Sequence, residues 1–231
     1  CVNDIITCGA KPLYFLDYIS LNRINNRVDD IMEGIIKGCE LAGVELIGGE
    51  TAEHPMTFDI DMAGFSTGII EEFDIGDGKL IKEGDIIIGI ESSGIHSNGY
   101  SLINHLIRQK KLKLTKDFLT PTHIYTSLVQ ELLNEVPILG MAHITGGGIP
   151  ENLPRCLPDG LNAHIDYNSW PLPKIFQKIM LAGEIPEEEM KKVFNLGIGY
   201  CVVVPEESEN DTHDTIDAFG YKSWTIGKVV L

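Results

Sequence analysis

The sequence predicts an α/β (α+β) protein of two lobes, in which helices flank mixed sheets. Apolar runs of strand length alternate along the chain with amphipathic segments of helical period. Residues 71–84 are rich in glycine and acidic residues, which is typical of a linker between lobes. With 231 residues the chain is long enough for two ordinary domains, and we expect them at residues 1–75 and 76–231.

In the first lobe the clearest element is a helix that Asn25 or Asn26 can cap and that Gly43 ends. Its apolar residues share one face. They are Val28, Ile31, Met32, Ile35, Ile36, Cys39 and Ala42. The other elements expected here are a helix end over residues 1–8, strands over 12–19 and 44–47, the latter buried, and a long strand over 58–70.

The second lobe is predicted to continue the alternation of strands and helices. The expected strands cover residues 85–91, 141–144, 161–166, 199–204 and 224–230. The expected helices cover residues 98–109, 123–136, 174–181 and 186–194, with a short helix beginning near Pro150.

The composition narrows the classes of partner. The formal net charge is −16, which disfavours nucleic acid or an anionic membrane as the main partner. An acidic protein binds a nucleotide through local features such as metal ions and backbone N–H groups, so we expect a metal-dependent nucleotide site. The five scattered cysteines suit a reducing compartment, and no apolar run reaches the length of a membrane span. The predicted location is the cytoplasm.

Three glycine-bearing segments carry most of the functional information. Each follows an apolar run typical of a strand, and the last two precede a predicted helix. Glycines in that setting let backbone N–H groups approach an anion such as a phosphate. The segments are Gly48-Gly49-Glu50-Thr51-Ala52-Glu53, Ser92-Ser93-Gly94-Ile95-His96-Ser97-Asn98-Gly99-Tyr100-Ser101 and His143-Ile144-Thr145-Gly146-Gly147-Gly148-Ile149-Pro150-Glu151-Asn152.

Two acidic residues are candidate ligands of Mg²⁺. Asp4 lies five residues before Gly9, and Glu50 follows two glycines at the end of a predicted strand. Carboxylates are suitable ligands for this ion, and Glu50 can also accept a hydrogen bond from a nucleoside. The alternatives are a solvated acid for Asp4 and a tight turn with an acid facing water for Glu50. Glu53 is a weaker candidate.

Two histidines are candidate catalytic residues. His96 lies between a predicted strand and a predicted helix, and His143 comes just before the triple glycine. An imidazole transfers protons near neutral pH or donates to a phosphate oxygen. A structural loop capped by Ser97 or Asn98 is the alternative for His96. The other five histidines, His54, His105, His123, His164 and His213, are interpreted as surface or core residues.

Together with Cys1-Val2-Asn3-Asp4, these segments resemble the aminoimidazole ribonucleotide synthetases, also called phosphoribosylformylglycinamidine cyclo-ligases. The resemblance runs from Cys1 to about Val230 and implies the two-lobed fold of that family. It also implies a first domain for ATP binding and dimerisation, and a homodimer. Asp17 and the Asn195-Leu196-Gly197-Ile198-Gly199 segment also resemble the family. A cap or a paired acid explains Asp17 equally well, and for the Asn195 segment we favour a structural turn.

The implied reaction closes the ring of formylglycinamidine ribonucleotide with ATP and Mg²⁺, in purine biosynthesis. ATP phosphorylates the formyl oxygen, the amidine nitrogen attacks that carbon, and phosphate leaves. The implied roles are metal ligation by Asp4 and Glu50, nucleotide binding by Gly48, Gly49, Glu50 and Thr51, catalysis by His96 and His143, and phosphate or substrate binding by Gly94, Ser97, Asn98, Thr145, Gly146 and Gly147.

Two alternatives remain at this stage. Selenophosphate synthetases and thiamine-phosphate kinases are similar, but an acid stands there in place of His143. A binding or assembly fragment is the other alternative, because the chain begins with Cys1 and lacks the family's upstream glycine–lysine loop. On that basis we expect the 231 residues alone not to cyclise the substrate. A strand over residues 58–70 with apolar residues on both faces supports the dimer.

Overall fold

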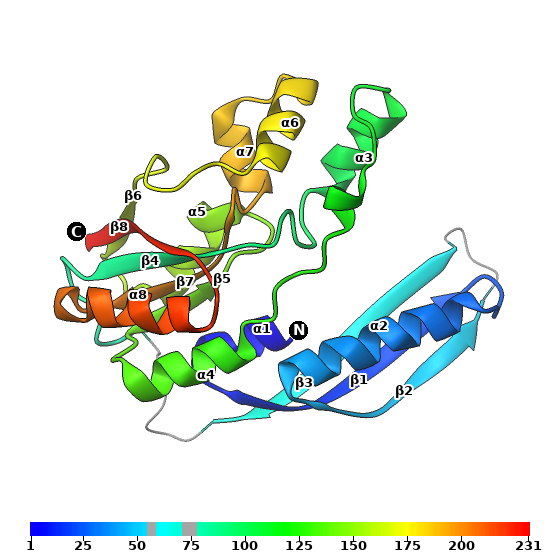
Figure 1. Cartoon of the computed structure of the whole chain (residues 1–231), viewed down its shortest axis with the longest axis horizontal. Coiled ribbons are helices and arrows are strands. Elements are labelled where there is room, and N and C mark those ends of the chain that lie inside the picture. The colour runs from blue at the N-terminus through cyan, green and yellow to red at the C-terminus, as the bar shows by residue number, and fades with distance from the viewer. Residues whose placement is uncertain (55–58, 71–77) are drawn as a thin grey trace. The chain divides into compact units, whose positions relative to one another are not determined.

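The computed structural model describes residues 1–54, 59–70 and 78–231, and it combines helices with two β-sheets (Figure 1). The mixed helix-and-sheet class is therefore confirmed. Phe58, the predicted first residue of a strand, and residues 71–77 of the predicted linker lie outside the described residues.

The chain divides into two compact units. The first unit consists of Cys1–Ile75 and Ile124–Gln130, and the second of Gly76–His123 and Glu131–Leu231. The helix α4 (Thr126–Glu135) contributes residues to both units. Leu128, Leu132 and Val136 are buried, as the apolar periodicity of this segment predicts.

The first unit is built on a three-stranded sheet of order β2-β1-β3. The central strand β1 (Lys11–Leu21) pairs in parallel with β2 (Glu45–Glu53) and antiparallel with β3 (Ile60–Ile69). The helix α2 (Arg27–Ala42) runs alongside these strands (Figure 1) and contacts β1 and β2. The unit begins with α1 (Val2–Ile5) and the 3₁₀ helix η1 (Ile6–Cys8).

The helix α2 has the predicted ends. Gly43 follows it in the left-handed conformation, with φ of 67°, which glycine adopts at little cost. At its start, the backbone N–H of Arg27 donates to Oδ1 of Asn25 over 3.0 Å. Asn25 therefore supplies the capping side chain, although Asn26 is the residue that precedes the helix.

One prediction in this unit is wrong. The strand expected over residues 44–47 continues to Glu53, so Gly48, Gly49, Glu50 and Thr51 lie inside β2 and not in a turn after it. Most of β2 is exposed, because it is an edge strand of a small sheet. Burial was predicted from the apolar residues at 44–47. The strand is instead exposed because it lies at the edge of the sheet.

The second unit is built on a five-stranded antiparallel sheet of order β5-β7-β4-β8-β6. Its strands are β4 (Ile86–Glu91), β5 (Gly140–His143), β6 (Asn162–Ile165), β7 (Ile198–Val204) and β8 (Ser223–Val230). Its remaining helical elements are α3 (Tyr100–Arg108), η2 (Lys116–Leu119), α5 (Gly148–Asn152), η3 (Leu153–Cys156), α6 (Lys174–Gly183), α7 (Glu187–Val193), η4 (Glu206–Ser208) and α8 (Glu209–Ala218).

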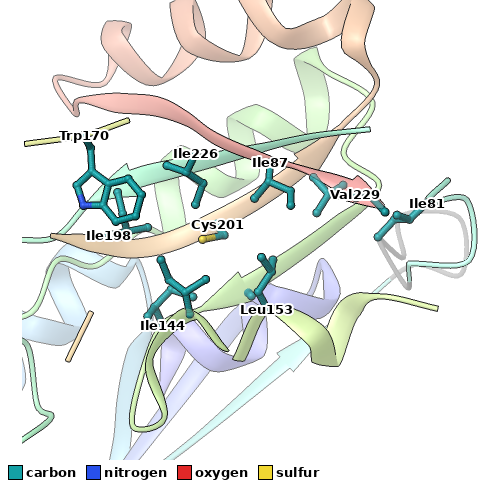
Figure 2. Close-up of a cluster of buried hydrophobic side chains, with 12 residues drawn as sticks. Ile81, Ile87, Ile144, Leu153, Trp170, Ile198, Cys201, Ile226 and Val229 are labelled. Carbon is teal, nitrogen blue, oxygen red and sulfur yellow. The ribbon is translucent and has the colours of Figure 1, made fainter. Parts of the chain in front are cut away.

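Two clusters of buried side chains in the described part of the second unit position its elements. One covers a face of the sheet and includes Ile87, Ile144, Leu153, Cys201 and Ile226 (Figure 2). The other joins α3, α6 and α7. Every residue of β7 is buried, because strands pair with it on both edges and side chains pack on both of its faces.

Two features of this unit differ from the predictions. The end of the predicted linker is part of the core, since Ile81 is buried in the cluster that also contains Ile87. The helix α8 was not predicted at all. Its sequence is mostly acidic and polar, and only Thr212 and Ile216 are buried, so its apolar periodicity is too weak to detect.

Candidate active site

The pairing of three strands places the histidine-bearing segments at one end of the sheet. Tyr200 of β7 pairs with Ile90, near the end of β4, and with His143, at the end of β5. The segments that follow β4 and β5 therefore emerge beside the beginning of β7. The rings of His143 and Tyr200 stack with a centroid distance of 6.3 Å.

His96 is buried in the segment that follows β4. Its side chain has only 3% exposure, and its backbone has a positive φ of 54°, which is uncommon for a residue other than glycine. The backbone N–H of Ser93 donates to His96 Nε2 over 3.2 Å. Burial, followed by the nearby imidazoles of His143 and His123, lowers the pKa of His96 to about 3. His96 is therefore neutral at physiological pH.

Asn195 holds the His96 segment in place. Its Nδ2 donates to the carbonyl of Gly94 over 2.9 Å. Its Oδ1 accepts from the hydroxyl of Ser92 over 3.0 Å and from the N–H of Gly197 over 2.8 Å. Asn195 is fully buried, so these bonds are made without competition from water. The family-like turn at Asn195 thus has a structural role.

A second buried asparagine fixes the triple-glycine segment. Asn152 Nδ2 donates to the carbonyls of Gly148 (2.8 Å) and Gly146 (3.1 Å), and its Oδ1 accepts from the Thr145 hydroxyl over 3.1 Å. Gly148 has φ of 62°, and a Cβ atom there would overlap the carbonyl oxygen of Lys191. Only glycine fits at this position, which explains one of the three glycines.

A third segment, over residues 120–123, completes the site and was not predicted. Ser93 Oγ donates to the Pro121 carbonyl over 2.6 Å, and the Ser97 and Thr122 hydroxyls lie 3.5 Å apart. The ring of His123 lies edge-on to that of His96, with centroids 6.2 Å apart. His123, interpreted from the sequence as a surface or core residue, therefore lies beside a candidate catalytic residue. No glycine or other local signal marks it, and only the tertiary fold brings it here.

The structure thus brings the predicted residues of the second unit together. A Cβ atom on Gly146 would lie 3.7 Å from Asn98 Oδ1, which places the glycine segment against the segment of His96. Gly94 and Ser97 belong to the His96 segment, and Thr145 and Gly147 to the other. Three imidazoles, several hydroxyls and two glycine-bearing backbones converge, which is an arrangement that can bind phosphate and move protons.

The predicted nucleotide residues lie in the first unit. Asp17, Met32, Leu46, Ile47, Gly48, Gly49, Glu50 and Thr51 line a hollow of about 410 Å³. A Cβ atom on Gly49 would lie 2.6 Å from the carbonyl oxygen of Asp17, so the close approach of β2 to β1 requires glycine there. Glu50 is exposed. Asp17, which was open to several interpretations, contributes a buried carboxylate to the hollow.

Asp4 lies in α1 of the first unit. Its side chain is exposed. It does not line the hollow that Glu50 lines. Among residues 1–54, 59–70 and 78–231, no group of three or more His, Cys, Asp or Glu side chains has an arrangement that could hold a metal ion.

Comparison with known families assigns the chain. The protein-family model described as "AIR synthase related protein, N-terminal domain" matches residues 1–70. The family model for the C-terminal domain of the same proteins matches residues 82–230. These matches define the class as AIR synthase related proteins. A phosphoribosylformylglycinamidine cyclo-ligase of Synechococcus sp. (strain CC9902) is 46% identical over 100% of this chain and 71% of its own length. The chain belongs to the phosphoribosylformylglycinamidine cyclo-ligase family.

Solved structures share the fold at lower identity. Thiamine-monophosphate kinase from Stenotrophomonas maltophilia K279a has a TM-score of 0.75 at 15% identity, over 99% of this chain and 72% of the kinase. The hydrogenase maturation protein HypE in complex with ATP has a TM-score of 0.75 at 19% identity, over 99% and 68%. No helix within the described part of the chain is long and apolar enough to cross a membrane.

Asn195→Ala should destabilise the second unit and loosen the His96 segment. It removes the partners of a buried carbonyl, hydroxyl and N–H group, and leaving one such group unpaired costs about 1–3 kcal/mol. We expect the free energy of unfolding to fall by at least ~2 kcal/mol in urea titrations, with faster amide exchange over residues 92–98. Asn162→Ala, at an exposed position of β6, is the control. Equal effects of the two substitutions would contradict the assigned role.

Proposed function

We propose that this protein closes the imidazole ring of aminoimidazole ribonucleotide from formylglycinamidine ribonucleotide, with conversion of ATP to ADP and phosphate, in purine biosynthesis. The observation that carries the proposal is the 46% identity with a cyclo-ligase across the whole chain. The likeness to kinase and HypE structures is a likeness of fold alone, at 15–19% identity. A cytoplasmic location suits such an enzyme.

Residues 1–75 form the proposed ATP-binding and dimerisation domain. Gly48, Gly49, Glu50 and Thr51 offer backbone and carboxylate groups around the hollow, and the solved HypE structure with the same fold binds ATP. Asp4 and Glu50 are the proposed ligands of Mg²⁺. One or two carboxylates suit a magnesium ion whose other ligands are phosphates and waters. The ion, when bound, neutralises charge on the triphosphate.

Residues 76–231 form the proposed domain for ring closure. His96 and His143 are the proposed catalytic residues, because both lie where two glycine-bearing segments converge. The backbones of Gly94, Gly146 and Gly147 offer donors for phosphate. The side chains of Ser97, Asn98 and Thr145 offer further polar groups for the substrate.

The proposal is tested by an activity assay on the full-length protein that the gene encodes. Formylglycinamidine ribonucleotide and ATP should yield ADP and a diazotisable aromatic amine in equal amounts. His143→Asn should lower turnover by roughly 10²-fold or more, the usual loss for one acid–base group, with KM within a few-fold. His143→Asp should alter the metal dependence without restoring turnover. ADP release without the aromatic amine would overturn the proposal.

Glu50→Gln should weaken binding of the magnesium–nucleotide complex. The change is nearly isosteric and removes only the charge, so the fold should be unaffected. Calorimetric titration with an ATP analogue should show a loss of affinity in the presence of Mg²⁺ and a smaller change in its absence. Glu45→Gln, at the exposed start of the same strand and outside the lining of the hollow, is the matched control. Unchanged affinity in both conditions would exclude Glu50 as a ligand.

A homodimer is the proposed assembly, and the sheet of the first unit is its proposed surface. Tyr14, Leu16 and Tyr18 of β1 and Phe65 and Ile69 of β3 are exposed large apolar residues. Leu16 pairs with Phe65, and such directly paired residues point to the same face. A second copy covering this face and the open edge of β3 would remove apolar surface from water.

Light scattering should give the mass of a dimer at micromolar concentration. Phe65→Glu, at a position with 64% exposure, should give a monomer because it places a charge in the proposed interface. Leu181→Glu in α6, at a position with 75% exposure, is the control and should leave the mass unchanged. A monomer mass for the unmodified protein would refute the assembly.

A further inference from the structure

The hydrogen bonding of His96 defines which of its nitrogens carries the proton. The N–H of Ser93 can only donate, so His96 Nε2 accepts. In a neutral imidazole the proton then lies on Nδ1. Asn195 anchors the same segment through Gly94, and the positive φ of His96 is a backbone conformation that the anchored segment imposes. His96 is thus held as a neutral donor.

Its surroundings keep this state in place. His123 lies edge-on to His96, with an angle of 82° between their planes, and His123 itself lies edge-on to Tyr221 with centroids 5.1 Å apart. Two imidazoles, those of His123 and His143, are the groups whose charge acts on His96. Burial lowers the pKa of His123, and the carboxylate of Glu91 opposes that shift. A positive charge on His96 would be buried beside two other imidazoles.

We propose that the three histidines have different roles: His96 is a neutral hydrogen-bond donor through Nδ1, His143 is the group that accepts the proton, and His123 is a positioning residue that keeps His96 buried. This inference rests on the proposed function. In the closing step the C–N bond forms and the C–O bond to phosphate breaks. Phosphate leaves with the bonding electron pair, and the proton of the attacking nitrogen passes to His143.

The proposed roles follow from what each imidazole can do. A group with a pKa of about 3 takes up a proton in only about one molecule in 10⁴ at pH 7, so His96 is a poor general base. A donor fixed in advance stabilises developing negative charge without rearranging. His143 is only partly buried and stacks on Tyr200, so it is the more accessible of the two proposed catalytic residues.

The state of His96 can be measured without any activity, so its failure is distinct from failure of the proposed function. Long-range ¹H–¹⁵N spectra of the ¹⁵N-histidine-labelled protein, assigned with single His→Gln variants, report the protonation of each nitrogen. Between pH 5 and 9 we expect His96 to carry its proton on Nδ1 throughout and not to titrate. A proton on Nε2, or titration of His96 within this range, would overturn the inference.

Matched variants test the donor role in catalysis. His96→Asn keeps an N–H donor close to the position of Nδ1 and tolerates a positive φ, whereas His96→Ala removes the donor. We expect Asn to retain turnover within about 10-fold and Ala to lose roughly 10²–10³-fold, with thermal melts to confirm folding. Equal losses for the two His96 variants would refute the donor role.

A further pair of variants tests His123. His123→Phe keeps a ring edge-on to His96, whereas His123→Ala opens the pocket to water. We expect the pKa of His96 to rise by at least about one unit in the Ala variant and to stay unmeasurably low in the Phe variant. His105→Ala is the control, since His105 in α3 is exposed and hydrogen-bonded to Gln109, which follows the helix. An unchanged His96 in both His123 variants would overturn the positioning role.

Discussion

The antiparallel register of β4, β7 and β5 is the constraint on which the candidate active site depends. Because β7 runs opposite to both neighbours, the ends of β4 and β5 meet its beginning, and Ile90 and His143 both pair with Tyr200. A shift of one residue in the pairing of β5 with β7 would turn His143 to the other face of the sheet. The burial of every residue in β7 makes such a shift costly.

The side-chain amides of two buried asparagines fix the segments that follow β4 and β5. Asn152 and Asn195 each bond to a backbone carbonyl and to a hydroxyl in a segment that contains a candidate site residue. An amide is suited to this task because it donates and accepts at once and carries no charge that burial would penalise. The candidate residues are therefore held in place by buried, uncharged side chains.

Much of this arrangement could be predicted from the sequence, and the failures have physical causes. The ends of α2 were predictable because an apolar face and Gly43 mark them locally. The position of Gly48–Thr51 within a strand was not, since pairing with β1, rather than local preference, extends β2 through two glycines. His123 was missed because its neighbour His96 is 27 residues away in the chain, and a single sequence carries no record of that contact.

The burial of a neutral His96 also makes the stability of the fold depend on pH. In the unfolded chain this imidazole has its ordinary pKa near 6.5, whereas in the native protein its pKa is about 3. Between these values the unfolded chain binds a proton that the native protein does not. Acidification below about pH 6.5 therefore favours unfolding, by up to about 1.4 kcal/mol per pH unit from this one group, until the native imidazole titrates as well. The feature that keeps His96 neutral thus also limits the range of pH in which the second unit is stable.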